Sequence, residues 1–165
     1  MSTRTTSPGN PMTRVARHLG RQRWFSDIGK RIVPLDLALQ RRTGGRLSLL
    51  KLAGMPSMLL ITTGRRTGRT RETPLLYVPH GREYVVIGSN WGGPRHPAWS
   101  ANLLAQPEAV VRIGTREVPV RARLVEGAER EQLWREVITP AWPAYDDYAA
   151  RAGQRRLRVF VLSPR

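Results

Sequence analysis

The feature of this sequence that most constrains its fold is a set of short apolar runs, most of which are joined by tight turns. The expected strands are Met58–Thr63, Glu72–Val78, Tyr84–Ile87, Glu108–Ile113, Glu117–Leu124 and Leu157–Leu162. His80-Gly81 and Gly114-Thr115 supply hairpin turns between consecutive runs. Parallel neighbours need a crossover of about a dozen residues, so these short connections favour antiparallel pairing.

The apolar pattern also indicates how the strands are buried. Val118, Val120 and Ala122 recur at every second position, which is the period of a strand with one face against a core. Helices are expected from Pro34 to Gly44-Gly45, from Pro97 to about Ala105, over Glu126–Ile138 before Pro140 and Pro143, and from Tyr145 onward. The sequence therefore predicts a mainly β protein with helices (α+β), built as a small antiparallel barrel with helices over its openings.

The N-terminal part differs from the rest in composition. Residues 1–13 are rich in Ser, Thr, Pro and Gly, and we expect them to be disordered. We divide the chain into a basic, partly disordered segment, residues 1–30, and a single folded domain, residues 31–165. Residues 1–51 hold eleven Lys and Arg against two acids, with Trp24 and Phe25 among them. Such a segment could lie on an anionic membrane surface, or it could simply pack on the domain.

Net charge narrows the classes of partner. Lys and Arg number 28 against 12 acids, which gives +16, and only Lys30 and Lys51 are lysines. This balance attracts polyanions: nucleic acid, an anionic membrane or a phosphorylated ligand. A GC-rich genome that encodes arginine in place of lysine is the alternative explanation. The basic residues are spread along the chain without a recognition helix or stacking motif, so we expect no specific nucleic acid partner.

Several kinds of chemistry are excluded by the residues present. The chain has no cysteine and no run of about 18 apolar residues, so disulfides, thiolate chemistry and a transmembrane helix are not predicted. Its three histidines form no metal-binding motif, so no metal is expected. Ser89 lacks the setting of a nucleophilic serine. These features are typical of a cytoplasmic protein.

Two glycine-rich loops stand out as a candidate ligand site. The first, Thr62–Arg71, carries four arginines, and Glu72 is the only nearby acid. Clustered like charges repel, so an anionic ligand would stabilise this loop, although a solvated turn is the alternative. The second, Gly88–Trp99, contains Ser89, Asn90 and Trp91. Further aromatic residues on a proline-broken segment could wall a cavity for a flat ring: Trp142, Tyr145 and Tyr148.

Taken in order, these motifs resemble one known family. The segments that carry the resemblance are Thr43-Gly44-Gly45-Arg46, Thr62–Gly68, Arg71-x-x-Pro74-Leu75, Gly88-Ser89-Asn90, His96–Trp99 with Asn102-Leu103, Pro143-Ala144-Tyr145-x-x-Tyr148 and Val159–Pro164. They resemble the deazaflavin-dependent nitroreductases, which use coenzyme F420 and occur mainly in actinobacteria. The resemblance spans about residues 35–164. It implies a split β-barrel related to flavin-binding oxidoreductases.

The resemblance also implies an activity and a site. The chain would be an oxidoreductase that transfers a hydride from reduced F420 to a quinone, a nitroaromatic compound or an activated alkene, with FMN as the second candidate cofactor. The residues expected to bind the cofactor are Arg65, Arg66, Thr67, Gly68, Arg71, Pro74, Gly88, Ser89, Asn90, Pro97, Ala98 and Trp99. The residues expected to act on the acceptor are Tyr145, Ser89 and Tyr148, with Tyr145 first.

Three positions depart from the family pattern and bear on the acceptor. Asn90 stands where some members have lysine, Trp91 where glycine is common, and Trp142 where tyrosine occurs. If Trp91 narrows the opening of the acceptor site, bulky nitroimidazoles would be excluded from it. A non-catalytic protein that binds F420 or a flavin is the main alternative function, and a basic nucleic-acid-binding module is the next alternative after it. If the basic segment binds lipid, the protein would lie peripherally at the inner face of the plasma membrane.

Overall fold

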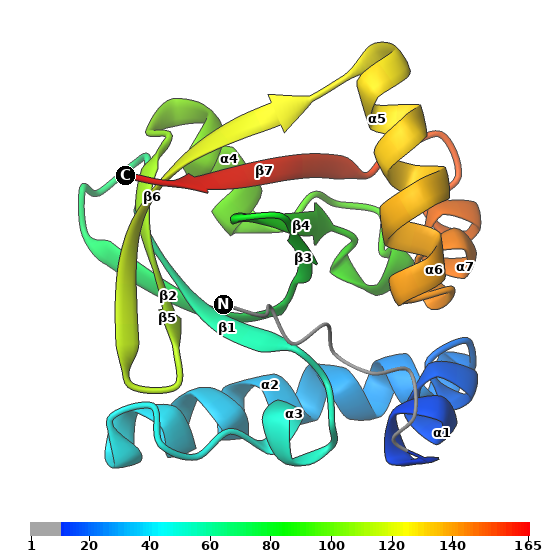
Figure 1. The fold of residues 1–165 in the computed structure, drawn as a ribbon, viewed down its shortest axis with the longest axis horizontal. Coiled ribbons are helices and arrows are strands. Elements are labelled where there is room, and N and C mark those ends of the chain that lie inside the picture. The colour runs from blue at the N-terminus through cyan, green and yellow to red at the C-terminus, as the bar shows by residue number, and fades with distance from the viewer. Residues whose placement is uncertain (1–10) are drawn as a thin grey trace.

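The computed structural model describes residues 11–165, with side chains from residue 14 onward. Its centre is one seven-stranded sheet with the order β2-β1-β5-β6-β7-β4-β3. The strands are β1 (Ser57–Thr63), β2 (Thr70–Leu76), β3 (Val78–His80), β4 (Glu83–Gly88), β5 (Glu108–Ile113), β6 (Arg116–Val125) and β7 (Arg158–Pro164). Every pair of neighbours is antiparallel. The sheet curls into a split barrel (Figure 1), which confirms the predicted fold.

A bend at Tyr77 makes this curl possible. The predicted strand 72–78 is in fact two strands, because Leu76 pairs with Ser57 of β1 while Val78 pairs with Val85 of β4. The chain therefore passes from one edge of the sheet to the other within a single residue. The backbone N–H of Tyr77 donates to the carbonyl of Pro56 at 3.1 Å and fixes the bend.

The sheet buries apolar side chains on both of its faces. Val86 and Phe160 are paired across β4 and β7 and point into one core, which α4 (Ala98–Ala105) covers. The neighbouring residues Val85 and Val159 point into a second core. Successive side chains of a strand point to opposite faces of the sheet. Because helices cover the outer face here, both sets of side chains are buried, one set in each core.

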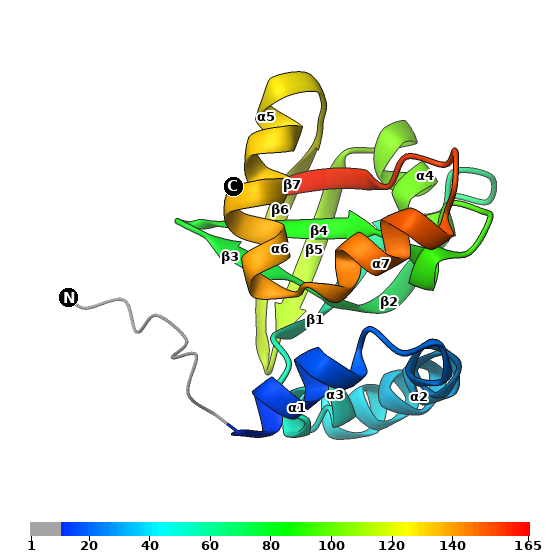
Figure 2. The ribbon, with the colours of Figure 1, turned by 90° about the vertical axis from the view of Figure 1, so that its right-hand side faces the viewer.

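The helices form two further groups. The N-terminal group is α1 (Pro11–Leu19), α2 (Arg23–Thr43) and α3 (Leu49–Leu52). The other comprises α5 (Gly127–Leu133), the π-helical turn η2 (Trp134–Ile138), α6 (Thr139–Ala141) and α7 (Ala144–Arg151). In Figures 1 and 2 the N-terminal group forms a layer beneath the barrel, and α7 lies between that layer and β4. None of the helices in residues 11–165 is long and apolar enough to cross a membrane.

Three expectations about the helices are wrong. Helix α2 begins at Arg23, so exposed Pro34 lies inside it and does not open it, although the helix does end at left-handed Gly44. Its span, Arg23–Thr43, crosses the division placed at residue 30, and the division into two parts stays a prediction. Helical conformation continues through Pro140 to Ala141 and stops at Trp142, whose backbone (φ −145°, ψ 88°) leaves the helical region before Pro143. Of the segment expected to be disordered, residues 1–10 lie outside the described part, and 11–13 belong to α1.

Candidate functional site

Two adjoining hollows lie against the barrel, one at the β1–β2 hairpin and α4, the other between the barrel and α2. The first, which we call the arginine pocket, has a volume of about 390 Å³ and is lined by Gly64, Arg65, Arg66, Thr67, Arg71, Glu72, Thr73, Ala98, Trp99 and Asn102. The second, the aromatic cavity, has a volume of about 250 Å³. Thr73 and Trp99 line both of them. The two glycine-rich loops are therefore connected through a shared wall, as expected for one ligand that contacts both.

The arginine pocket is built on the hairpin between β1 and β2. The last ladder pair joins Thr63 and Thr70, and beyond it the N–H of Gly64 donates to the carbonyl of Arg69 at 2.8 Å. Gly68 has a φ of 66°, a left-handed conformation that favours glycine, and its N–H donates to the carbonyl of Gly64. The turn is therefore closed by its own backbone, and its arginine side chains are free to face a ligand.

A buried asparagine from α4 braces this hairpin. The Asn102 side-chain oxygen accepts a hydrogen bond from the Arg65 N–H at 3.2 Å, and its nitrogen donates to Thr62 Oγ1 at 3.1 Å. Only 5% of Asn102 is exposed. Asn102 belongs to a motif of the family resemblance, but the sequence gave no sign of this contact, because its partners lie 37 and 40 residues away.

The charge of the arginine loop is not neutralised locally. None of Arg65, Arg66, Arg69 and Arg71 has a carboxylate partner within residues 14–165. The one nearby acid, Glu72, is paired at 2.5 Å with Arg41 of α2. Guanidinium groups bind phosphates and carboxylates through paired hydrogen bonds. The donor set therefore fits the anionic tail of F420.

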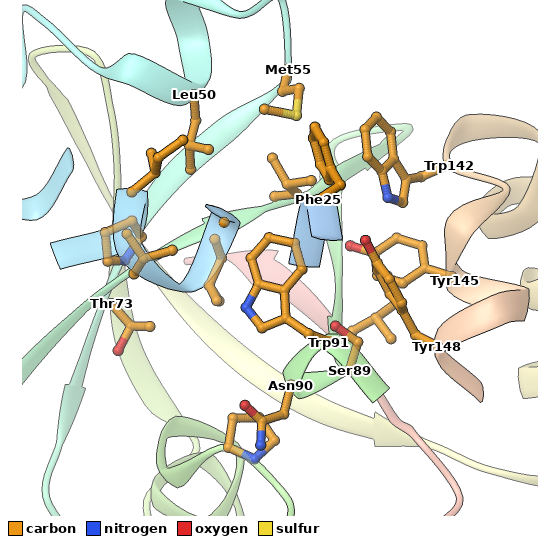
Figure 3. A pocket seen from close by; sticks show the side chains of 18 of the residues that line it. Phe25, Leu50, Met55, Thr73, Ser89, Asn90, Trp91, Trp142, Tyr145 and Tyr148 are labelled. Atoms are coloured by element: carbon orange, nitrogen blue, oxygen red, sulfur yellow. The ribbon is translucent and has the colours of Figure 1, made fainter. Parts of the chain in front are cut away.

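The aromatic cavity is walled by helices as well as by the sheet. Figure 3 shows Trp91 in its centre, with Trp142, Tyr145 and Tyr148 on one side and Thr73 on the other. Helix α2 contributes a stripe at helical spacing: Phe25, Ile28, Gly29, Ile32 and Val33. Sequence reasoning missed this wall because it treated residues 1–30 as a separate basic segment. The i, i+3, i+4, i+7, i+8 spacing of these five residues was the signal that could have found it.

Tyr145 has the properties of a hydrogen-bond donor. Its side chain is almost fully buried between Trp134 and Tyr148. Within the described part its hydroxyl has no hydrogen-bond partner, and in Figure 3 it points toward the cavity. Burial raises the pKa of Tyr145 far above its usual value, and the neighbouring Tyr148 adds to the shift. The phenol is therefore protonated at neutral pH.

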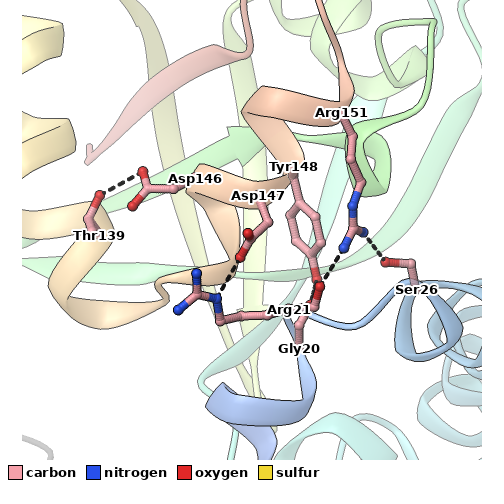
Figure 4. Close-up of polar contacts among 8 residues, drawn as sticks. All are labelled: Gly20, Arg21, Ser26, Thr139, Asp146, Asp147, Tyr148 and Arg151. Atoms are coloured by element: carbon pink, nitrogen blue, oxygen red, sulfur yellow. Dashed lines mark hydrogen bonds and ion pairs between the residues drawn. The ribbon is translucent and has the colours of Figure 1, made fainter.

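Tyr148 is placed differently, although its ring lines the same cavity. Its hydroxyl donates to the carbonyl of Gly20 at 3.0 Å, in the corner between α1 and α2. Figure 4 shows this corner held to α7, with Arg151 bonded to Ser26 as well. The hydroxyl of Tyr148 thus anchors the N-terminal layer, and its proposed action on the acceptor stays a prediction.

The turn after β4 presents Ser89, Asn90 and Trp91 to the cavity. Asn90 has a φ of 44° and Trp91 a φ of 55°, which is unusual for residues other than glycine. The Asn90 side chain is bonded to the carbonyl of Arg95 at 2.9 Å. Trp91 lies against Tyr148, with ring centroids 5.9 Å apart. This turn is therefore held in a strained shape by packing and hydrogen bonds.

The expected site residues divide between the two hollows. Those in the arginine pocket are Arg65, Arg66, Thr67, Arg71, Ala98 and Trp99. Those in the aromatic cavity are Pro74, Ser89, Asn90, Pro97, Trp99, Tyr145 and Tyr148. Gly68 and Gly88 line neither hollow: Gly68 lies at the tip of the arginine loop and Gly88 at the end of β4.

Comparison with known proteins now identifies the family. The family model described as F420H(2)-dependent quinone reductase matches residues 34–164. The chain belongs to this family. It is 33% identical over 146 residues to an F420H(2)-dependent quinone reductase of Mycobacterium tuberculosis, covering 87% of this chain and 97% of that one. The predicted F420-dependent, quinone-reducing oxidoreductase is thereby confirmed at the level of the family.

Solved structures agree with this assignment. An F420H2-dependent reductase, FDR-A, is 35% identical and superposes with a TM-score of 0.59 over 66% of this chain and 94% of its own. Another structure, described as a domain-swapped dimer, is 33% identical with a TM-score of 0.62, covering 85% of this chain and 97% of that one. A heme-binding protein of Mycobacterium smegmatis, 18% identical with a TM-score of 0.52, shares the fold alone.

Proposed function

We propose that this F420H(2)-dependent quinone reductase binds the anionic tail of the cofactor in the arginine pocket and its ring at the turn Gly88–Asn90. The acceptor is a quinone in the aromatic cavity. The observation that carries the proposal is that the shared wall, Thr73 and Trp99, joins an unneutralised cationic pocket to an aromatic one. Bound F420H2 supplies a hydride and is a poor one-electron carrier.

The chain has three tasks in this reaction. Arg65, Arg66 and Arg71 hold the tail, and Asn102 keeps their loop in place. The apolar walls exclude water, which strengthens every polar contact inside the cavity. The hydroxyl of Tyr145 donates a hydrogen bond to a quinone oxygen and stabilises the negative charge that develops there. Ser89 is the second candidate donor, because it lines the same cavity.

The tail site is tested by comparing arginines within one loop. Each charge-assisted contact contributes about 1.5–3 kcal/mol, so Arg65→Ala or Arg71→Ala should raise the Kd for F420 about 10- to 100-fold. Arg69→Ala is the matched control, because Arg69 lies in the same loop but does not line the pocket. Fluorescence titration with F420, and with FMN in parallel, measures these constants.

Two results would contradict the tail site. If Arg69→Ala and Arg71→Ala raised the Kd for F420 equally, the loop would attract the cofactor only through its overall positive charge and not through specific contacts in the pocket. Tighter binding of FMN than of F420 by the wild type would exclude the deazaflavin. Stoichiometric F420 binding without turnover of menadione or other acceptors would favour the alternative of a non-catalytic binding protein.

The range of acceptors follows from the position of Trp91. Its indole fills the middle of the cavity and packs between Gly29 and Tyr148. We therefore expect small quinones such as menadione to be reduced, and bulky nitroimidazoles to be poor acceptors until Trp91 is replaced by glycine. Wild-type protein that reduces both classes equally well would contradict this role of Trp91.

A peripheral contact with an anionic membrane is favoured by a separate observation. Trp24, Ile28 and Leu35 lie on one face of α2 and are 50%, 44% and 62% exposed, and Arg31 lies on the same face. An exposed apolar stripe with basic residues is the pattern of helices that bind membrane surfaces. Because Ile28 also lines the cavity, this face would place the cavity near lipid-dissolved quinones at the inner face of the plasma membrane.

Surface substitutions test this contact without removing the cavity wall. Trp24→Ser with Leu35→Ser should abolish sedimentation with vesicles that contain anionic lipid. Leu104→Ser on α4 is the control, because Leu104 is 47% exposed on a different element. Unchanged sedimentation of the double variant would rule this face out.

A further inference from the structure

The turn that follows β4 has a backbone that requires restraint. Asn90, Trp91 and Gly92 are three consecutive residues with positive φ, at 44°, 55° and 76°. For residues other than glycine this conformation costs about 1 kcal/mol or more each, and it persists only where the surroundings fix it. Short backbone hydrogen bonds inside the turn join Gly92 to Ser89 and Gly93 to Asn90. These bonds define the turn but do not attach it to the rest of the fold.

One arginine attaches both ends of this turn to the loop between α7 and β7. Arg155 lies between α7 and β7, and its Nη1 and Nη2 donate to the carbonyls of Gly88 and Ser89 at 3.1 and 2.6 Å. Its Nε donates to the carbonyl of Gly93 at 2.9 Å. The guanidinium therefore bonds to the backbone immediately before and immediately after the run of positive φ. A planar fork with fixed donor directions can make these three contacts at once, whereas a lysine ammonium at the same place cannot match them.

Arg155 is separate from the parts of the site that contact ligands. It lines neither the arginine pocket nor the aromatic cavity. It has no carboxylate partner within residues 14–165, and its donors are directed at carbonyl oxygens and, at 3.5 Å, at His96 Nδ1. Its side chain is only partly exposed. A charged group held this way stabilises the conformation of the backbone that it binds.

We propose that Arg155 is a positioning residue, which fixes the turn Gly88–Gly93 so that Ser89 and Trp91 face the cavity at the place where the cofactor ring meets the acceptor. This inference rests on the proposed function for the location of the ring. Without the guanidinium, the turn relaxes toward ordinary backbone conformations and moves Ser89 and Trp91. The tail site in the β1–β2 hairpin is untouched by such a change, so turnover is impaired more than cofactor affinity.

The first test needs no cofactor. Amide hydrogen exchange is measured on apo wild type, Arg155→Lys and Arg155→Gln, with Arg156→Gln as the matched control. Arg156 is the next residue, and its guanidinium pairs at the surface with Glu131 at 2.5 Å. Exchange in residues 88–93 should rise at least about tenfold in both Arg155 variants while the strands stay protected. Unchanged exchange in this turn in folded Arg155→Lys would overturn the proposal.

The second test uses F420H2 and menadione with the same variants. We expect kcat to fall about tenfold or more in Arg155→Lys while the Kd for F420 changes less than about threefold. A more mobile turn with unchanged kcat would also overturn the positioning role. Failure of the proposed function itself is distinguishable, since wild-type protein would then bind no F420 whatever the exchange data show.

Discussion

The contact between Gly29 and Trp91 gives a quantitative test of how α2 closes the cavity. A Cβ added at Gly29 would lie 2.3 Å from Cη2 of the Trp91 indole and within 2.9 Å of two further ring atoms. Overpacking of this kind costs about 1–3 kcal/mol. Replacing a glycine inside a helix by alanine in turn stabilises by about 0.5–1 kcal/mol. Gly29→Ala should therefore lower the free energy of unfolding by about 0.5–2 kcal/mol in the wild type.

The sign should reverse once the indole is removed. In a Trp91→Gly background the added methyl group has no clash, so Gly29→Ala should stabilise by the helix-propensity gain of about 0.5–1 kcal/mol. The two substitutions then show a coupling free energy of about 1–3 kcal/mol in a double-mutant cycle. Urea denaturation of the four proteins, followed by far-UV circular dichroism, measures each value.

The result that would refute the reasoning is an equal effect of Gly29→Ala in both backgrounds. It would mean that α2 does not press on Trp91 in solution, so that the cavity lacks its helical wall. Menadione reduction gives a parallel readout, because a displaced indole should lower kcat/KM in Gly29→Ala even where the protein remains folded.

Other predictions concern the brace, the donor and a titrating group. Asn102→Leu leaves the Arg65 N–H and the Thr62 hydroxyl without a partner, so it should cost about 1–3 kcal/mol in urea denaturation and weaken F420 binding. Tyr145→Phe should lower kcat for menadione about a hundredfold with an unchanged Kd for F420. Because burial raises the pKa of Tyr145, its phenol should cause no loss of wild-type activity up to about pH 10. Burial, and then two neighbouring guanidinium groups, lower the pKa of His96, so the unfolded chain binds this proton more readily. The free energy of unfolding should therefore fall as pH drops through about 6.5, and His96→Asn should flatten that fall in denaturation series between about pH 5 and 8.

The parts of the fold that were predictable from the sequence depend on local chemistry. Turn residues and period-two alternation locate the hairpins, because each strand of a hairpin meets a partner only a few residues away. Arg65 and its neighbours are visible as a charge cluster for the same reason. The pairing of the two glycine-rich loops as one ligand site was inferred from their residues, but nothing in the sequence indicated that Thr73 and Trp99 form a wall common to both hollows.

The parts that were missed depend on contacts between distant segments. Nothing near Gly29 indicates that an indole 62 positions later rests on it. Arg155 bonds to backbone carbonyls, which every residue has, so no side-chain pattern marks its partners. The bend at Tyr77 likewise follows from the closure of the barrel, since both halves of that segment have ordinary strand composition.

The bend at Tyr77 has a consequence for how the molecule avoids self-association. Because of this bend, the two edge strands of the sheet, β2 and β3, are consecutive in the chain. Each edge strand contains a proline, Pro74 in β2 and Pro79 in β3. A proline cannot donate the hydrogen bond that an incoming strand needs, and exposed borders are where fibril growth starts. Replacement of Pro79 by valine would restore a backbone N–H on the shorter edge strand, β3. The segment that closes the barrel therefore also limits the pairing of its edges with strands of other molecules.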